Sequence, residues 1–502
     1  MPGQVIKVVL TNRGAAKSKY GAAGWTKIRS SLTTLSKTDK AHGITTRLLC
    51  VDSATDAKKV GATKVTAAAD AQALKEFVDR VFAVWKPAYL LLVGGPDLLP
   101  QVQLDNPLWT GNPDDDPDRF IPSDLPYACD SPYSTSANQF RGPTRVIGRL
   151  PDLMADTAPT VLLGLLATAA HATTTKRPNP APVFAVSAKV WQTSTQLSVS
   201  KLASVTGSLH TSPADGPTWA KAAFAAPIHF INCHGGDSDP KFYGQASATN
   251  WNLPTALDSA LVGGVAAKAT VVSAECCYGA AHWPPSSAGG QRSVAMSYLA
   301  CGAYGFFGAS TVAYGPAAAN DYADVLARLF LEQVLAGASL GRAALTARQQ
   351  FVQGQSFLDP TDIKTLTQFD LLADPSVQPF ASAGTTAQGT VTAGVLSRRD
   401  VASAIGGALQ SSVLVSAAVP RSRAGLTSAR LASLLGSAVP PGTQIRTFDS
   451  SSGGPGERGL AAALAPVAHI VFLPTRGRRP KSLVVVREEP GSPTQVRLVV
   501  RR

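Results

Sequence analysis

Two reactive side chains follow apolar, strand-like segments near the middle of the chain. His234 lies two residues after Ile228–Asn232, and Cys277 lies four residues after Thr270–Ser273. Because chemistry collects at the carboxyl ends of parallel strands, neighbouring strands would bring these side chains together in an open groove. A thiol that attacks an amide needs a proton donor for the leaving amine, and histidine supplies one near neutral pH. The pattern therefore predicts a nucleophile paired with a general acid and base.

Glycine follows each reactive residue closely. Gly235 comes directly after His234, and Gly279 comes two residues after Cys277. Because glycine has no side chain, nearby backbone N–H groups can approach a substrate carbonyl and stabilise an oxyanion. Both segments are therefore suited to attack on a carbonyl group.

The first 380 residues alternate apolar segments with amphipathic ones, a pattern typical of an α/β protein with a mostly parallel sheet. Two long connections rich in Pro, Gly, Asp and Ser, 101–143 and 278–292, are typical of functional loops. The expected strands are Val5–Leu10, Thr46–Val51, Tyr89–Val93, Arg145–Gly148, Val183–Ser187, Ile228–Asn232, Thr270–Ser273 and Tyr304–Phe307. The expected helices include Gln72–Trp85, Asp156–His171, Asn320–Leu335 and Gly341–Val352.

The segment around Cys277 resembles known cysteine peptidases. Its residues 275–279, Glu-Cys-Cys-Tyr-Gly, are similar to the Gln-Ala-Cys-Arg-Gly of caspases and the Asp-Cys-Cys-His-Ser-Gly of metacaspases. In both patterns the catalytic cysteine falls on Cys277, and a His-Gly pair such as His234-Gly235 comes one strand earlier. Further segments resemble the gingipain branch of this group, in the same order along the chain: Tyr89–Pro100, Ser123–Tyr127, Val146–Pro151, Gly305–Thr311 and Phe369–Ser376.

This resemblance implies a caspase/gingipain-like three-layer α/β sandwich with a mostly parallel sheet, plus a small C-terminal appended domain. It implies that Cys277 forms a thioester acyl-enzyme and that His234 protonates the leaving amine and then assists water. The backbone N–H groups of Gly235 and Cys277 would form the oxyanion hole. The group needs no third member beside this dyad and no cofactor, so none is assigned.

Substrate selection is where the sequence departs from gingipains, whose arginine preference depends on an acidic residue after the strand matched by Val183–Ser187. The corresponding segment, Ala188–Ser198, contains no carboxylate. Because a buried arginine without a counter-charge is costly, a strong preference for a basic P1 residue is not expected. Trp191, Thr195 and Gln196 are the candidates for lining the substrate pocket.

Metal binding is a weaker interpretation of the same residues. Cys233, Cys276, Cys277 and His234 contain zinc-binding types, but adjacent strand residues point to opposite faces and no Cys-x-x-Cys spacing is present. The acidic run Asp114–Asp118 fits no known calcium cage and is expected to be a solvated loop. No metal site is therefore predicted.

The C-terminal quarter differs from the rest in charge. Residues 383–502 carry 15 Lys+Arg and 5 Asp+Glu, and so +10 of the net charge of +13. Such a surface suits an acidic docking or activating partner. Nucleic acid is not expected, because the region offers only Phe448 and Phe472 for base stacking. We therefore predict an N-terminal α/β subdomain at 1–151, a catalytic subdomain at 152–380, a linker at 381–389 and a basic domain at 390–502.

These features favour a cysteine endopeptidase that cleaves protein substrates, with regulated defence or signalling in a bacterium as its setting. A cytoplasmic location is expected, because the N-terminus lacks a secretory pattern and no apolar stretch is long enough to span a membrane. Six cysteines in 502 residues are not typical of a disulfide framework, and most are expected to be free thiols. The alternative function is a catalytically silent caspase-like scaffold that binds a protein partner.

Overall fold

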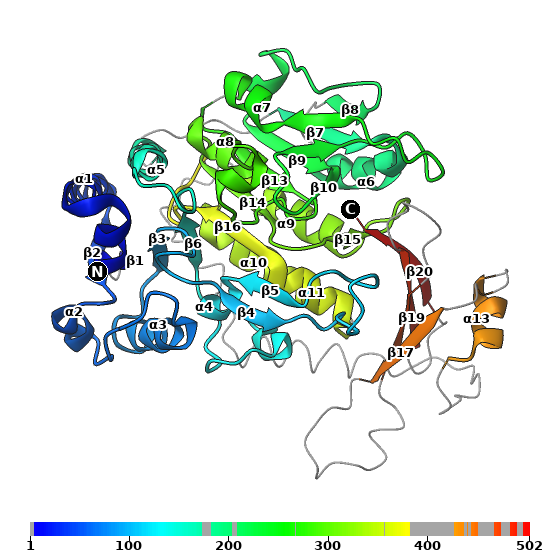
Figure 1. Ribbon diagram of the computed structural model, residues 1–502, viewed down its shortest axis with the longest axis horizontal. Coiled ribbons are helices and arrows are strands. Elements are labelled where there is room, and N and C mark those ends of the chain that lie inside the picture. Colours follow the sequence, from blue (N-terminus) through cyan, green and yellow to red (C-terminus); the bar gives the residue numbers. More distant parts are fainter. Residues whose placement is uncertain are drawn as a thin grey trace, which may run out of the picture.

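The architecture was taken from a computed structural model, which describes residues 5–172, 182–202, 208–266, 268–355, 357–381, 426–435, 439, 443–449, 466–472, 482–488 and 495–501. Its centre is a sheet of ten strands with helices on both faces (Figure 1). In spatial order the strands are β2 (Ile44–Cys50), β1 (Val5–Thr11), β3 (Tyr89–Val93), β6 (Ile147–Leu150), β16 (Phe369–Ala373), β14 (Gly305–Ala309), β13 (Val271–Ala274), β9 (Ile228–Asn232), β7 (Val183–Ala188) and β8 (Ser208–Ser212).

The sheet consists of two parallel halves that run in opposite directions. Neighbouring strands are parallel throughout, except that β16 pairs with β14 in antiparallel fashion. The expected mostly parallel α/β sandwich is therefore confirmed. The predicted domain boundaries at 151 and 380 stay predictions, and the predicted linker, apart from Ala381, lies outside the described residues.

Alternating side chains of the strands enter two separate apolar layers, because successive strand residues point to opposite faces. One layer, with Val9, Leu91 and Val272, is covered by α1 (Arg13–Ala41), α5 (Thr160–Ala172), α7 (Ser259–Val265) and α8 (Val294–Ala300). The other, with Val8 and Leu90, is covered by α2 (Ala54–Lys59), α3 (Ala71–Trp85), α4 (Leu125–Ala128), α6 (Gln192–Leu202), α9 (Ala323–Leu335), α10 (Leu340–Gln353) and α11 (Pro360–Gln368). These layers hold the strands rigidly, and with them the loops at the strand ends.

A buried ion pair explains two of the motifs seen in the sequence. Arg149 on β6 donates two hydrogen bonds to the carboxylate of Asp124, and it also donates to the carbonyls of Gly94 and Leu99. Arg149 is fully buried, so these partners replace the water that the guanidinium has lost. The Ser123–Tyr127 and Val146–Pro151 segments therefore lock the loop after β3 to the sheet.

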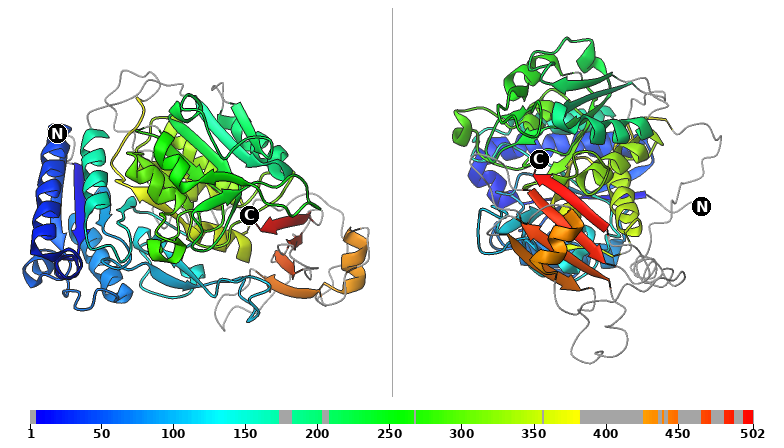
Figure 2. Two further views of the ribbon diagram at one scale, coloured as in Figure 1. Left: turned by 45° about the horizontal axis from the view of Figure 1, so that its top comes forward. Right: turned by 90° about the vertical axis from the view of Figure 1, so that its right-hand side faces the viewer.

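Three smaller sheets surround the main one. Two are formed by β4 (Val102–Asp105) with β5 (Phe120–Ser123), and by β10 (His234–Gly235), β11 (Lys241–Tyr243) and β12 (Thr255–Asp258). The third has the order β15 (Tyr314–Gly315), β20 (Gln495–Arg501), β19 (Ser482–Glu488), β18 (Val467–Phe472) and β17 (Gln444–Asp449). Its C-terminal strands and α13 (Ser428–Leu435) lie at the end of the molecule away from α1 (Figure 1, Figure 2). Within the described ranges, no helix is both long and apolar enough to cross a membrane.

Candidate active site

His234 and Cys277 extend from two adjacent strands in the same register. Strands β9 and β13 are parallel neighbours, and Ala274 lies opposite Ile231. His234 and Cys277 each come three residues after that pair, so the two residues occupy equivalent positions beyond the ends of their strands. The backbones then nearly touch, because a Cβ atom placed on Gly235 would lie 2.0 Å from the carbonyl oxygen of Cys277. The predicted meeting of the two strand ends is therefore present.

A tight turn follows Cys277. Tyr278 has a φ of 54°, which a non-glycine residue adopts only when its surroundings hold it there. Its backbone N–H donates to the carbonyl of Thr311 at 3.0 Å, and its hydroxyl donates to Asp118 at 2.8 Å. The backbone next to Cys277 is thus fixed from two sides.

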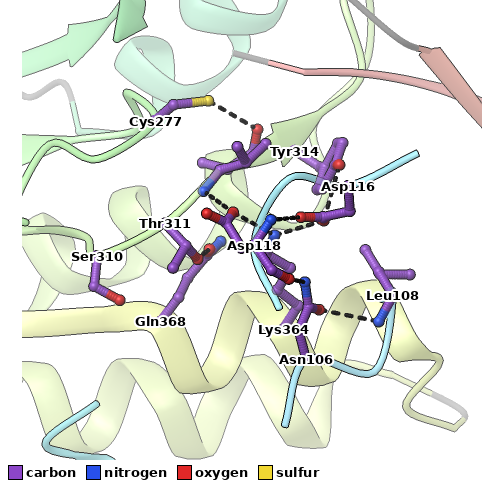
Figure 3. Close-up of polar contacts among 12 residues, drawn as sticks. Asn106, Leu108, Asp116, Asp118, Cys277, Ser310, Thr311, Tyr314, Lys364 and Gln368 are labelled. Carbon is purple, nitrogen blue, oxygen red and sulfur yellow. Dashed lines mark hydrogen bonds and ion pairs between the residues drawn. The ribbon is translucent and has the colours of Figure 1, made fainter. Parts of the chain in front are cut away.

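Asp118 connects the two loops that surround Cys277. One of its carboxylate oxygens accepts from the Tyr278 hydroxyl, and the other accepts from the backbone N–H of Val312 at 2.8 Å. Lys364 of α11 forms ion pairs with Asp116 at 2.6 Å and Asp118 at 3.1 Å (Figure 3). The expectation of a solvated acidic loop is therefore wrong for these two residues. Asp116 is fully buried and Asp118 nearly so, because a lysine far away in the sequence neutralises them.

His234 is enclosed by two side chains that hold its ring. The indole of Trp191 packs against the imidazole with ring centroids 4.3 Å apart. The Nε2 atom of His234 lies 2.9 Å from Oε1 of Gln245. The amide nitrogen of Gln245 donates to the carbonyls of Ser247 and Asn250, so its oxygen is left as the acceptor for the histidine. This arrangement places the proton on Nε2.

Gln245 was not identified from the sequence, and neither was a carboxylate beside the predicted pocket segment. Gln245 lies beyond β11 with no motif to mark it, and the pairing of β10 with β11 helps to bring it back to His234. The predicted pocket segment contains no acidic residue, but Ser194 within it donates to the buried carboxylate of Asp324 on α9. A sequence pattern within one segment cannot reveal a partner that a distant helix supplies.

The three predicted pocket residues have different surroundings. Trp191 contacts His234, as described above. Thr195 is fully buried, and its hydroxyl is hydrogen-bonded to Ser187, to the Trp191 carbonyl and to Asn232. Gln196 is exposed on α6. Of the three, only Trp191 is placed beside a proposed catalytic side chain by a contact in the structure.

The other cysteines near the site are poorly suited to nucleophilic attack. Cys233 and Cys276 are completely buried in the core, and burial raises the pKa of both thiols above the ordinary range. All six cysteines are free thiols. No group of three or more His, Cys, Asp or Glu side chains among the described residues could hold a metal ion.

Comparison with known proteins identifies the family. The model of peptidase family C25 matches residues 25–380, which is more than half of the chain. The chain belongs to this family. C25 is the gingipain family of cysteine peptidases, so the protein is a hydrolase of the cysteine-type endopeptidase class, and its substrates are proteins.

A solved structure described as "Structure of Protease" is 12% identical to this chain, with a TM-score of 0.48, and the match covers 100% of this chain and 98% of that one. No curated protein matches the chain. The C25 match ends at residue 380, so the C-terminal strands lie outside it.

One feature of this C25 peptidase differs from the expected open groove. Cys277 has an exposed fraction of 0%. It belongs to an apolar cluster that includes side chains of the C-terminal strands β18, β19 and β20. Its Sγ points to the carbonyl oxygen of Ala313, 3.6 Å away (Figure 3). The expectation of an open groove is therefore wrong for this conformation, because the thiol is buried in this cluster.

Proposed function

We propose that this C25 endopeptidase cleaves peptide bonds with a dyad of Cys277 and His234. The thiol of Cys277 first passes its proton to His234, and the resulting thiolate attacks the carbonyl carbon of the scissile bond to form a tetrahedral intermediate. The C–N bond then breaks, and the leaving amine takes a proton from His234. The resulting thioester is cleaved by a water molecule that transfers a proton to His234, and the thiolate leaves. The observation that carries this proposal is that the two residues each follow, by three positions, a residue pair in register on adjacent parallel strands.

Gln245 orients the imidazole in this mechanism. Because Nε2–H donates to Gln245, the lone pair on Nδ1 is the basic site of the neutral ring. Trp191 packs against the ring and restricts its rotation. Both residues would keep His234 in one tautomer and one orientation during the reaction, so no carboxylate is needed as a third member.

The backbone N–H groups of Gly235 and Cys277 form the proposed oxyanion hole. The close approach of Gly235 to the Cys277 backbone brings these two segments together without an intervening side chain. Two such donors stabilise the negative charge that develops on the substrate oxygen. A side chain at position 235 would separate them.

The test is a cleavage assay on a peptide library with two alanine variants. Cys277→Ala is expected to abolish cleavage, because it removes the nucleophile. Cys276→Ala, the matched control, is expected to retain it, because Cys276 packs in the core. Cleavage that persists in Cys277→Ala would overturn the proposal.

The alternative is a scaffold that binds a protein partner without cleaving it. A scaffold has no need for a histidine and a cysteine held in register, which favours the enzyme. Partner binding that is unchanged by Cys277→Ala, with no cleavage of any peptide even under conditions in which iodoacetamide reaches Cys277, would favour the scaffold.

The setting that we propose is regulated proteolysis in the cytoplasm of a bacterium, in defence or signalling. The basic composition of residues 383–502 supports an acidic docking or activating partner. Cleavage products identified by mass spectrometry from cells that contain the active protein would test this setting. Products restricted to a few intracellular proteins would support it, and general degradation would contradict it.

A further inference from the structure

The C-terminal strands form a sheet that is joined to the catalytic part by its backbone. Strand β20 pairs with β15 in antiparallel fashion, with Tyr314 opposite Arg501 and Gly315 opposite Val500. Strand β15 directly follows Ala313, whose carbonyl accepts the hydrogen bond of the Cys277 thiol. The C-terminal sheet therefore begins at the loop that contacts the proposed nucleophile.

One face of this sheet packs into the apolar cluster in which Cys277 is buried. The side chains on that face alternate along each strand, as expected for a sheet with two different faces. They share an apolar cluster with Cys277, Val312 and Tyr322, and they are Ile470 and Phe472 of β18, Leu483 and Val485 of β19, and Val499 of β20. All of them are at most 2% exposed. The alternate residues Val471, Val484 and Val486 pack on the opposite face against Leu431 of α13.

A buried ion pair fastens the same face to the catalytic part. Arg487 continues the alternation of Leu483 and Val485, and its guanidinium lies 2.7 Å from the carboxylates of both Asp359 and Asp362 at the start of α11. Its side chain is 3% exposed and both carboxylates are fully buried. Removal of the arginine would leave two buried carboxylates without a counter-charge, which is strongly unfavourable.

Catalysis is incompatible with this covered arrangement. The reacting atoms of a peptide bond must come within about 3–3.5 Å of Sγ, so the substrate needs the space that these apolar side chains fill. An extended polypeptide also binds readily to a free sheet edge by adding a strand. The edge of β15, next to Cys277, is already occupied by β20.

We propose that the C-terminal sheet is a built-in inhibitor of the peptidase, which covers Cys277 and occupies the strand edge of β15 until it is displaced. This inference rests on the proposed function of Cys277. The structure then describes the latent form, and activity requires a partner, a ligand or a cleavage event that detaches the sheet. In the latent form the activity equals that of the small fraction of molecules in which the sheet has detached.

The test measures how fast iodoacetamide alkylates Cys277 in the full chain, followed by peptide mapping. Arg487→Gln removes the ion pair with α11. Val485→Asp weakens the same contact without touching the ion pair, because it places a charge in the apolar face. Each variant is expected to raise the rate of labelling at Cys277 at least tenfold, a change that corresponds to about 1.4 kcal/mol.

Arg430→Gln is the matched control. Arg430 of α13 forms an ion pair with Glu488 of β19 inside the C-terminal unit. Its loss is expected to change the labelling of Cys277 by less than twofold. Cys129 and Cys276 report on global unfolding, since both are fully buried, and they should stay unlabelled in every variant.

The outcomes separate the two proposals. If Cys277 of the unmodified chain is labelled as fast as the partly exposed Cys301, or if neither Arg487→Gln nor Val485→Asp speeds its labelling, the inhibitor proposal is overturned. If labelling rises while the variants cleave no unfolded protein substrate, the cover is real and the proposed function fails. Labelling and cleavage that rise together support both.

Discussion

Gly235 offers a sharp test of how closely the two strand ends approach. We expect Gly235→Ala to impair the active site, because the new Cβ would lie 2.0 Å from the carbonyl oxygen of Cys277. Real Cβ atoms are essentially never found within 3.0 Å of another heavy atom, so one backbone must move by at least about 1 Å. The obstacle is main chain, which cannot rotate away as a side chain could.

The expected effects have different magnitudes in the two assays. Overpacking of this kind lowers the free energy of unfolding by about 1–3 kcal/mol. A displacement of about 1 Å between catalytic groups lowers kcat/KM by about 100-fold. The first quantity is measured by urea unfolding, and the second by peptide cleavage in the Arg487→Gln background, where Cys277 is expected to be uncovered.

Gly164→Ala is the control for this substitution. A Cβ on Gly164 of α5 meets no atom within 4 Å, so the change should stabilise the helix by about 0.5–1 kcal/mol and leave activity unchanged. If Gly235→Ala unfolds within about 0.5 kcal/mol of the unmodified chain and cleaves within twofold of its rate, the described contact between the strands is wrong.

Three further predictions concern single contacts. Gln245→Ala should lower kcat by about 10- to 100-fold with little change in KM, because His234 loses the acceptor that fixes its tautomer; an unchanged kcat would exclude this role. Tyr278→Phe should lower the free energy of unfolding by about 1.5 kcal/mol and also lower kcat, because the turn after Cys277 loses its hydrogen bond to a carboxylate; full activity in steady-state kinetics would show that the turn does not depend on it. Burial raises the pKa of Asp152 from 3.8 to about 6, so the folded pKa of this carboxyl exceeds its unfolded pKa. The stabilisation that the protonated carboxyl contributes is therefore complete below pH 4 and is lost as the pH rises through 6. The free energy of unfolding of the unmodified chain, relative to Asp152→Asn, should therefore fall by about 2 kcal/mol between pH 4 and pH 7 in urea titrations, and a difference that does not vary with pH would contradict this assignment.

Features with a local pattern could be predicted from the sequence. The strands that end near His234 and Cys277 are short apolar runs followed by glycine, and their place in a parallel sheet follows from the alternation of strands and helices. The equal register of the two residues is a consequence of that arrangement. The main sheet and the meeting of the two strand ends were therefore within reach of sequence reasoning.

Features that depend on pairing between distant segments could not be predicted. Strand β16 was not identified as a strand, and its antiparallel pairing with β14 has no local marker. Asp116 and Asp118 look solvated in the sequence, and their counter-charge comes from Lys364, which lies more than 240 residues later. The apolar side chains near Cys277 come from strands in which successive residues point to opposite faces, as in other strands. Nothing in the composition of these strands indicates which surface they contact.

The central claim is that Cys277 carries the acyl group during peptide cleavage. The most direct measurement is mass spectrometry of the Arg487→Gln protein, quenched in acid during turnover of a peptide substrate and then mapped. The mechanism predicts an acyl adduct, labile to hydroxylamine, on the peptide that contains Cys277, and loss of this adduct in Cys277→Ala but not in Cys276→Ala. Turnover that continues with no adduct, or with an adduct on another residue, would contradict it.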